Sequence, residues 1–153
     1  MASPSLGAIA PEFELPGTGG RSYSLSEYRG QPVVLVFYPG DNTPVCTKQL
    51  TSYTENFSQF AGVGAQVLAI SPQSVDSHEG FAAKHGFTFP LLADTDKKVA
   101  GLYGTLGPLG YPRRSVFVID GDGVIRYLHR AIAGLTYRST DELVRAVQAA
   151  RPL

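Results

Sequence analysis

Cysteine is nearly absent from this 153-residue sequence, which contains Cys46 and no other. A single cysteine excludes a disulfide within the chain. The three histidines, His78, His85 and His129, are scattered and lack the neighbouring cysteines of a thiolate zinc site, so we expect each at the surface or at a helix end. We therefore predict no metal site and no cofactor, and Cys46 is either inert or reactive alone.

An excess of charge and long apolar runs are also missing. Thirteen basic residues balance thirteen acidic ones, so no field of one sign attracts a nucleic acid or an anionic membrane. No apolar run is long enough to span a bilayer, and residues 1–16 lack the basic start and apolar core of a secretory signal. We predict no nucleic-acid partner, no membrane partner and a cytoplasmic location.

What the sequence does contain is an alternation of strands and helices that suits a single domain over residues 1–153. The apolar run Val33–Tyr38 predicts a central parallel strand that is covered on both faces, and Gln66–Ile70 predicts another apolar strand. The other extended segments that we expect are an N-terminal hairpin of Glu12–Leu15 and Arg21–Leu25, a short piece at Phe87–Leu91, and a second hairpin of Ser115–Ile119 and Val124–Leu128.

Apolar residues spaced by three and four predict the helices. Thr43–Gly62 is the longest, with Thr43 as its cap, Pro44 as its first residue and a stripe that includes Leu50, Tyr53 and Ala61. The others are Ser74–His85, Asp94–Tyr103 with acidic residues in its first turn, and Ser139–Ala150. The fold class is therefore α/β: a thioredoxin-like sandwich in which helices flank a central mixed β-sheet that carries an N-terminal β-hairpin extension.

Cys46 lies in the first turn of the predicted helix that follows the central strand. Unpaired N–H groups and the positive end of the helix dipole favour a thiolate there, and the carboxyl ends of strands are where α/β sheets form sites. Thr43 lies three residues before Cys46, where its hydroxyl would both cap the helix and serve the site. Pro39 would supply an apolar wall without an N–H group. Taken singly, Thr43 is better explained as a cap and Pro39 as a strand terminator, and only their joint spacing with Cys46 favours functional residues.

Residues 39–46, Pro-Gly-Asp-Asn-Thr-Pro-Val-Cys, resemble the Pro-x-x-x-Thr-x-x-Cys motif of the peroxiredoxin family. The resemblance extends to the stretches APEFELP and LSEYRGQPVVLVFYP before the motif, and to FPLLAD and RRSVFVIDGDGVIR after it. Within this family, the sequence is most similar to the bacterioferritin-comigratory, or Q-type, branch. The resemblance implies a thiol peroxidase with Cys46 as its nucleophile.

The resemblance also implies an arginine from a later strand that faces the sulfur. The family pattern of Arg, two residues, an aromatic, two aliphatics and Asp is met from Arg114 to Asp120, so Arg114 is favoured over Arg113. A guanidinium beside a sulfur favours the thiolate and can donate a hydrogen bond to a peroxide oxygen as charge develops. The implied catalytic residues are thus Cys46, Thr43, Arg114 and Pro39.

The implied substrates are hydrogen peroxide and organic hydroperoxides. Many Q-type relatives carry a resolving cysteine five residues after the reactive one, where this chain has Thr51. The resemblance therefore implies a 1-Cys mechanism, in which an external thiol (thioredoxin, glutaredoxin or a low-molecular-weight thiol) reduces the sulfenic acid, in antioxidant defence. It further implies a monomer or a weak homodimer. Gln49 stands where glutamate is frequent in the family, with an effect that the sequence leaves open.

Other functions compete with this interpretation. A free cysteine is commonly a small buried hydrophobe, and Cys46 taken alone fits that description. Alternatively, oxidised Cys46 forms mixed disulfides with partners as a peroxide-responsive signalling protein. A thiol–disulfide oxidoreductase is disfavoured, because Thr43 occupies the first cysteine position of a Cys-x-x-Cys motif.

Overall fold

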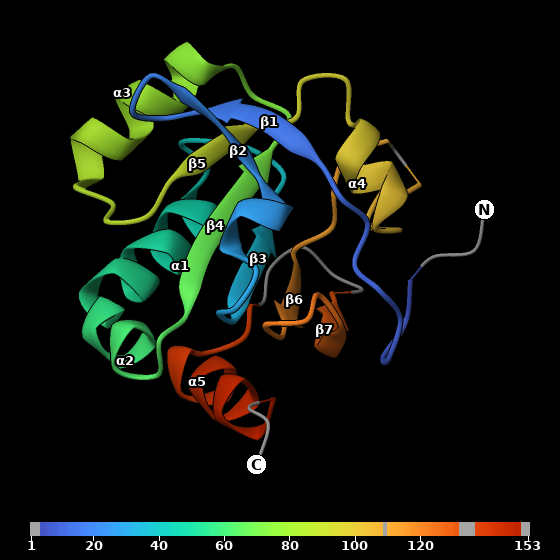
Figure 1. The fold of residues 1–153 in the computed structure, drawn as a ribbon. Coiled ribbons are helices and arrows are strands. Elements are labelled where there is room, and N and C mark those ends of the chain that lie inside the picture. Colours follow the sequence, from blue (N-terminus) through green and yellow to red (C-terminus); the bar gives the residue numbers. More distant parts are fainter. Residues whose placement is uncertain (1–3, 109, 132–136, 151–153) are drawn as a thin grey trace.

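The computed structural model describes residues 4–108, 110–131 and 137–150, and its strands form one seven-stranded mixed sheet (Figure 1). The strand order is β2-β1-β5-β4-β3-β6-β7. The strands are β1 (Glu14–Gly17), β2 (Arg21–Ser24), β3 (Val33–Phe37), β4 (Gln66–Ser71), β5 (Leu91–Ala93), β6 (Ser115–Ile119) and β7 (Ile125–Arg130). The α-helices are α1 (Pro44–Glu55), α2 (Phe57–Gly62), α3 (Val75–His85), α4 (Lys98–Leu102) and α5 (Thr140–Ala149), and a 3₁₀ turn spans Leu25–Tyr28.

The central strand is β3, whose five residues are all buried, as its unbroken apolar run predicts. β4 runs parallel to it on one side, and β6 runs antiparallel on the other. Phe37, the last residue of β3, pairs with Ser115, the first residue of β6. The residues just after β3 and just before β6 therefore meet at the carboxyl end of the central strand.

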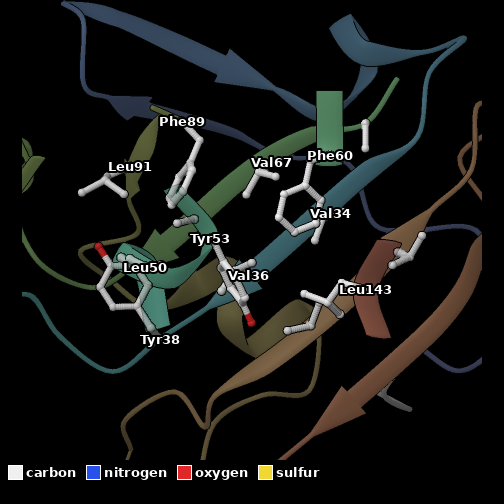
Figure 2. Packing of buried hydrophobic residues seen from close by; sticks show 14 of the residues in the cluster. Val34, Val36, Tyr38, Leu50, Tyr53, Phe60, Val67, Phe89, Leu91 and Leu143 are labelled. Carbon is white, nitrogen blue, oxygen red and sulfur yellow. The ribbon is translucent and has the colours of Figure 1, made fainter. Parts of the chain in front are cut away.

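Helices cover both faces of the sheet, as the predicted sandwich requires. On one face α1, α2 and α5 pack over the sheet, and Leu50 and Leu143 from the helices join Val36 from β3 in a buried cluster (Figure 2). On the other face α4 and the segment before β1 contribute Val99 and Phe13 to a second cluster. Figure 1 shows α4 on the side of the sheet opposite to α1 and α2.

Local capping fixes the predicted helices α3 and α5. The Ser74 hydroxyl accepts the N–H of Ser77 at the start of α3, and Gly86 ends this helix in the left-handed conformation at φ 65°. The Ser139 hydroxyl accepts the N–H of Glu142 at the start of α5. Both predictions are confirmed to within a residue at each end.

The predicted uninterrupted helix over Thr43–Gly62 is wrong, because Asn56 separates α1 from α2. Its backbone has φ −105° and ψ 20°, and its side-chain amide donates to the Ser52 carbonyl at 2.8 Å. An asparagine side chain competes with the backbone for such carbonyls and so ends a helix. The apolar stripe is also shorter than predicted, since Ala61 is exposed.

Both predicted hairpins are confirmed, with small shifts of their ends. β1 and β2 are antiparallel, and β1 extends through Pro16 and Gly17, which the sequence assigned to the turn. β6 and β7 are antiparallel around the Asp120–Gly123 turn, where Gly123 adopts φ 84°, a conformation that suits glycine.

The predicted extended piece at Phe87–Leu91 is wrong, since β5 is Leu91–Ala93 and begins after Pro90. Proline has no N–H for the ladder, so pairing starts beyond it. Phe87 and Phe89 instead stack on each other with ring centroids 5.9 Å apart. Burial of the aromatic rings, rather than strand pairing, determines the path of this segment.

The predicted helix over Asp94–Tyr103 is shorter in the structure, where α4 begins at Lys98. Asp94 lies before the helix instead of in its first turn. Its carboxylate nevertheless accepts the N–H groups of Val99 (3.1 Å) and Ala100 (2.9 Å). The acidic residue stabilises the helix start from outside, because the first N–H groups of a helix lack partners within it.

Candidate active site

Cys46 lies in the first turn of α1 and is completely buried. Thr43 is the residue before the helix, and Pro44 is its first residue, as predicted. Pro44 fits there because its missing N–H would have no partner at a helix start. The sulfur is therefore held at the positive end of a twelve-residue helix, next to the carboxyl end of β3.

Arg114 donates a hydrogen bond from Nη1 to the Cys46 Sγ at 2.7 Å. It immediately precedes β6, so the β3–β6 pairing carries it to the start of α1. Arg114 is 6% exposed, whereas its neighbour Arg113 is exposed. The structure thus brings together the two residues, 68 positions apart, that the resemblance singled out.

Gln49 links this pair to the rest of α1. Its Oε1 accepts a hydrogen bond from Arg114 Nη1 at 3.4 Å, and its Nε2 donates to Tyr53 Oη at 3.2 Å. Tyr53 in turn donates to the Arg138 carbonyl at 2.6 Å. Because the Tyr53 proton goes to that carbonyl, its oxygen accepts from Gln49, which fixes the amide with its oxygen toward Arg114. Sequence reasoning missed Tyr53 in this role, since its place on the apolar stripe indicated only packing.

Thr43 is at the predicted cap position, but its hydroxyl forms no cap hydrogen bond. Instead it donates to the Gly40 carbonyl at 3.2 Å. The prediction that this hydroxyl caps the helix is wrong, because it turns back to the Gly40 carbonyl and accepts no N–H group of the helix. The Thr43 side chain is exposed, and its function in the site stays a prediction.

Pro39 follows Tyr38, which lies just after β3 and donates its N–H to the Ile70 carbonyl of β4 at 3.0 Å. Pro39 has no N–H, so it ends the ladder, and it is half-buried at the start of the loop that leads to Cys46. Its function as a wall of the site also stays a prediction.

A second polar cluster lies beside the site and contains Asp41 and His78. Both side chains are fully buried, and His78 Nδ1 lies 2.7 Å from Asp41 Oδ2. The expectation of a surface or helix-end histidine is wrong for His78, which lies on the same face of α3 as the buried Phe81. That three-residue spacing from Phe81 was the sequence signal that could have placed it inside.

A large cavity lies away from Cys46. It has a volume of about 730 Å³ and is lined by residues that include Pro32, Gly64 and Gly121. Pro32 and Gly64 precede β3 and β4, so the cavity opens at the amino ends of these strands and not at the candidate site.

No described residues form a group of three His, Cys, Asp or Glu side chains that could hold a metal ion. Within the same part of the chain, no helix is both long and apolar enough to cross a membrane.

Comparison with known proteins gives a consistent result. The model of the AhpC/TSA family matches residues 6–128. The chain is 40% identical over 132 residues to the chloroplastic peroxiredoxin Q of Oryza sativa subsp. japonica, a match that covers 82% of this chain and 58% of that protein's length. It is also 40% identical over 126 residues to a putative peroxiredoxin of Mycobacterium tuberculosis, covering 78% of this chain and 80% of the relative.

Solved structures show the same similarity. The crystal structure of the peroxidoxin BcpB from Mycobacterium tuberculosis has a TM-score of 0.86 and 33% identity, with 96% of this chain and 98% of that chain covered. Peroxiredoxin Q of Xanthomonas campestris has a TM-score of 0.82 and 29% identity, with 90% of each chain covered. The thioredoxin-like fold predicted from the sequence is thus confirmed over nearly the whole chain.

Proposed function

Because this chain belongs to the AhpC/TSA family and is similar to peroxiredoxins of the Q type, we propose that it reduces hydroperoxides through Cys46. The Cys46 thiolate attacks the terminal oxygen of hydrogen peroxide or of an organic hydroperoxide. The O–O bond breaks, and the leaving oxygen takes up a proton to depart as water or an alcohol. Cys46 is left as a sulfenic acid.

The observation that carries this proposal is the hydrogen bond from Arg114 Nη1 to Cys46 Sγ, 2.7 Å long and inside a buried site. A buried cysteine that serves only packing has no need of a guanidinium, and burying a charge without a purpose costs stability. In the proposed mechanism Arg114 favours the thiolate and then donates to the peroxide oxygens as negative charge develops. Thr43 donates to or accepts from the bound peroxide, and Pro39 excludes water beside it.

Turnover in this proposal needs a thiol from outside the chain. Cys46 is the sole cysteine in the sequence, and position 51 is Thr51, so no intrachain disulfide can form. The sulfenic acid therefore condenses with an external thiol, and a second thiol then releases Cys46 by exchange. Thioredoxin, glutaredoxin and a low-molecular-weight thiol are the candidate reductants. A cytoplasmic location, a function in antioxidant defence and a monomer or weak homodimer stay predictions of the same proposal.

Stopped-flow oxidation by hydrogen peroxide and by a bulky organic hydroperoxide tests the proposal. We expect fast oxidation of the wild type, none of Cys46→Ser, and a large fall in the rate constant for Arg114→Ala. Arg113→Ala is the matched control, because Arg113 is adjacent but exposed, and it should react like the wild type. Equal rates for Arg114→Ala and wild type would exclude the proposed function of the arginine. Mixed disulfides with negligible steady-state turnover would favour the signalling alternative.

A further inference from the structure

A buried carboxylate lies in the loop that joins β3 to the Cys46 helix. We call residues 39–43 the site loop, since they include Pro39 and Thr43. Asp41 lies at the middle of this loop, and its side chain is completely inaccessible. A carboxylate without access to water is costly unless hydrogen bonds and opposite charge compensate it. The compensation at Asp41 comes from outside the site loop.

Three side chains direct hydrogen bonds at this carboxylate. Tyr38 donates its O–H to Oδ1 at 2.7 Å, and the Ser77 hydroxyl donates to Oδ2 at 2.7 Å. His78 Nδ1 also lies 2.7 Å from Oδ2. In addition, the Asp41 backbone N–H donates to Gln73 Oε1 at 3.0 Å. Three of these four partners lie in or just before α3, so Asp41 ties the site loop to that helix.

The other ring nitrogen of His78 determines where the protons lie. Nε2 is 2.9 Å from the Leu92 carbonyl, which can only accept, so Nε2 carries a proton. Burial opposes ionisation of Asp41, but the hydrogen bonds from His78, Tyr38 and Ser77 outweigh it and hold the Asp41 pKa below its usual value. His78 therefore extends the tie from the site loop to β5, because one ring nitrogen contacts Asp41 and the other contacts the Leu92 carbonyl.

Tyr38 connects the same network to the buried cluster that contains Cys46. Tyr38 and Cys46 belong to one buried cluster, in which Figure 2 shows Tyr38 beside Leu50. Burial raises the pKa of Tyr38 well above its usual value, and so do the charge and the hydrogen bond of Asp41. Tyr38 therefore keeps its proton and remains a donor to Asp41.

The backbone of the site loop needs such a restraint. Asn42 adopts φ 63°, in the left-handed region that a residue other than glycine occupies at a cost. Conformations of this kind persist where the surroundings determine them. The bonds of Asp41, immediately before Asn42, are the contacts that do so.

On the basis of the proposed peroxidase function, we propose that Asp41 and His78 are a positioning pair. Anchored to α3 and β5, these two residues hold the site loop in the conformation that places Pro39 and Thr43 against a peroxide bound at Cys46. Neither residue touches the peroxide. Their effect passes through the backbone of residues 39–43.

The test compares two reagents on Cys46. Oxidation of Cys46 by peroxide needs the complete site loop, whereas alkylation of the thiolate by iodoacetamide does not. The ratio of the oxidation rate constant to the alkylation rate constant therefore measures the positioning of the site loop separately from the reactivity of the thiolate. The variants are Asp41→Asn, which keeps the shape and removes the charge, and Ser77→Ala, which removes one donor and leaves the contact between Asp41 and His78. Asp76→Asn is the matched control, because Asp76 is an exposed carboxylate on the same helix. Circular dichroism at the assay temperature selects folded protein.

We expect the peroxide rate constant to fall at least about tenfold in Asp41→Asn, with alkylation changed less than about threefold. Ser77→Ala should show a smaller fall in the same ratio, and Asp76→Asn no fall. An unchanged ratio in folded Ser77→Ala and Asp41→Asn would overturn the positioning pair and leave the proposed function intact. If iodoacetamide alkylates the wild-type protein but peroxide does not oxidise it, the proposed function is contradicted, and the positioning pair with it. The wild type alone gives that result, so the two failures are distinguishable.

Discussion

The charge of Arg114 is what separates Cys46 from an ordinary buried cysteine. Nη1 of this guanidinium donates both to Cys46 Sγ and to Gln49 Oε1. Arginine presents several donors in one rigid plane, whereas lysine concentrates its charge at a single flexible ammonium group. The effect of Arg114 on Cys46 therefore depends on the geometry of its donors as well as on its charge.

Replacing Arg114 by lysine tests that distinction. We expect the rate constant for oxidation of Cys46 by hydrogen peroxide in Arg114→Lys to fall by about tenfold or more, because the charge stays but the donors no longer reach the sulfur and the peroxide together. Stopped-flow fluorescence or competition kinetics measures this, with Arg113→Lys as the control. A lysine variant as fast as the wild type would show that charge alone is sufficient.

A second prediction concerns the hydroxyl group of Tyr53. It accepts from Gln49 and donates to the Arg138 carbonyl, so Tyr53→Phe leaves both groups without their partner. The free energy of unfolding should fall by about 1–3 kcal/mol, measured by urea denaturation. Tyr111→Phe, at an exposed tyrosine, should change it by less than about 0.5 kcal/mol. Equal stability of Tyr53→Phe and wild type would contradict the hydrogen-bond chain.

Among the elements, α3 connects the sheet to the site loop through Ser77 and His78. Its length is set at the C-terminal end by Gly86, at φ 65°, where an added Cβ would meet no atom within 4 Å. The same helix contains Gly80, which is exposed, has a helical backbone and also has open space around it.

The same substitution, glycine to alanine, should change the stability of the protein in opposite directions at these two positions. Gly86→Ala should destabilise the protein by about 1 kcal/mol, because alanine is strained at positive φ. Gly80→Ala should stabilise it by about 0.5–1 kcal/mol, because alanine loses less backbone entropy in a helix. Thermal unfolding of the two variants beside the wild type measures both changes. Shifts of the same sign would contradict the assignment of Gly86 as the end of α3.

Sequence patterns predicted the helices and strands correctly where one local rule was decisive. Val33–Phe37 is an unbroken apolar run and is the central strand, and Ser74 and Gly86 delimit α3 as expected. The patterns failed where the chemistry of one residue overrode apolar spacing: Asn56 breaks a helix that the spacing continues, and β5 starts only after Pro90. In the site, the motif led to Cys46 and Arg114. The burial of His78 with Asp41 depends on how α3 docks against the site loop, which spacing alone does not specify.

For the whole molecule, the fold separates two features at opposite ends of the central strands. Cys46 and Arg114 meet at the carboxyl end of β3, and the cavity of about 730 Å³ opens near Pro32 at the amino end. Long-range strand pairing thus assembles the site, because β6 must align beside β3 before Arg114 reaches the sulfur. Integrity of the site and global stability are consequently linked.

That link predicts a dependence of stability on pH. Burial opposes ionisation of Asp41, but the hydrogen bonds from His78, Tyr38 and Ser77 leave its folded-state pKa below the usual 3.8. The unfolded chain then binds more protons than the folded one between these two pKa values, so this stabilisation is present above pH 3.8 and is lost as the pH falls through the lower pKa. Urea denaturation between about pH 6 and pH 2.5 should show wild-type stability falling in acid.

The variant Asp41→Asn should fall less steeply over the same range, since the titrating group is gone. Some slope should remain, because Asp120 contributes with the same sign: burial opposes its ionisation, yet hydrogen bonds from Arg126 and from backbone N–H groups hold its pKa below the usual value. Parallel curves for Asp41→Asn and wild type would mean that Asp41 is not the buried carboxylate described above.

The central claim is that Cys46 alone performs the oxidative step and relies on another molecule for its reduction. Peroxide consumption without any reductant tests this claim most directly, followed by mass spectrometry of Cys46 trapped with a sulfenic-acid probe. The account predicts that about one equivalent of hydrogen peroxide is consumed per chain and that the probe attaches at Cys46. Consumption should continue only after a thiol is added, and Cys46→Ser should consume none. Undiminished consumption by Cys46→Ser, or a wild type that consumes no peroxide, would contradict the account.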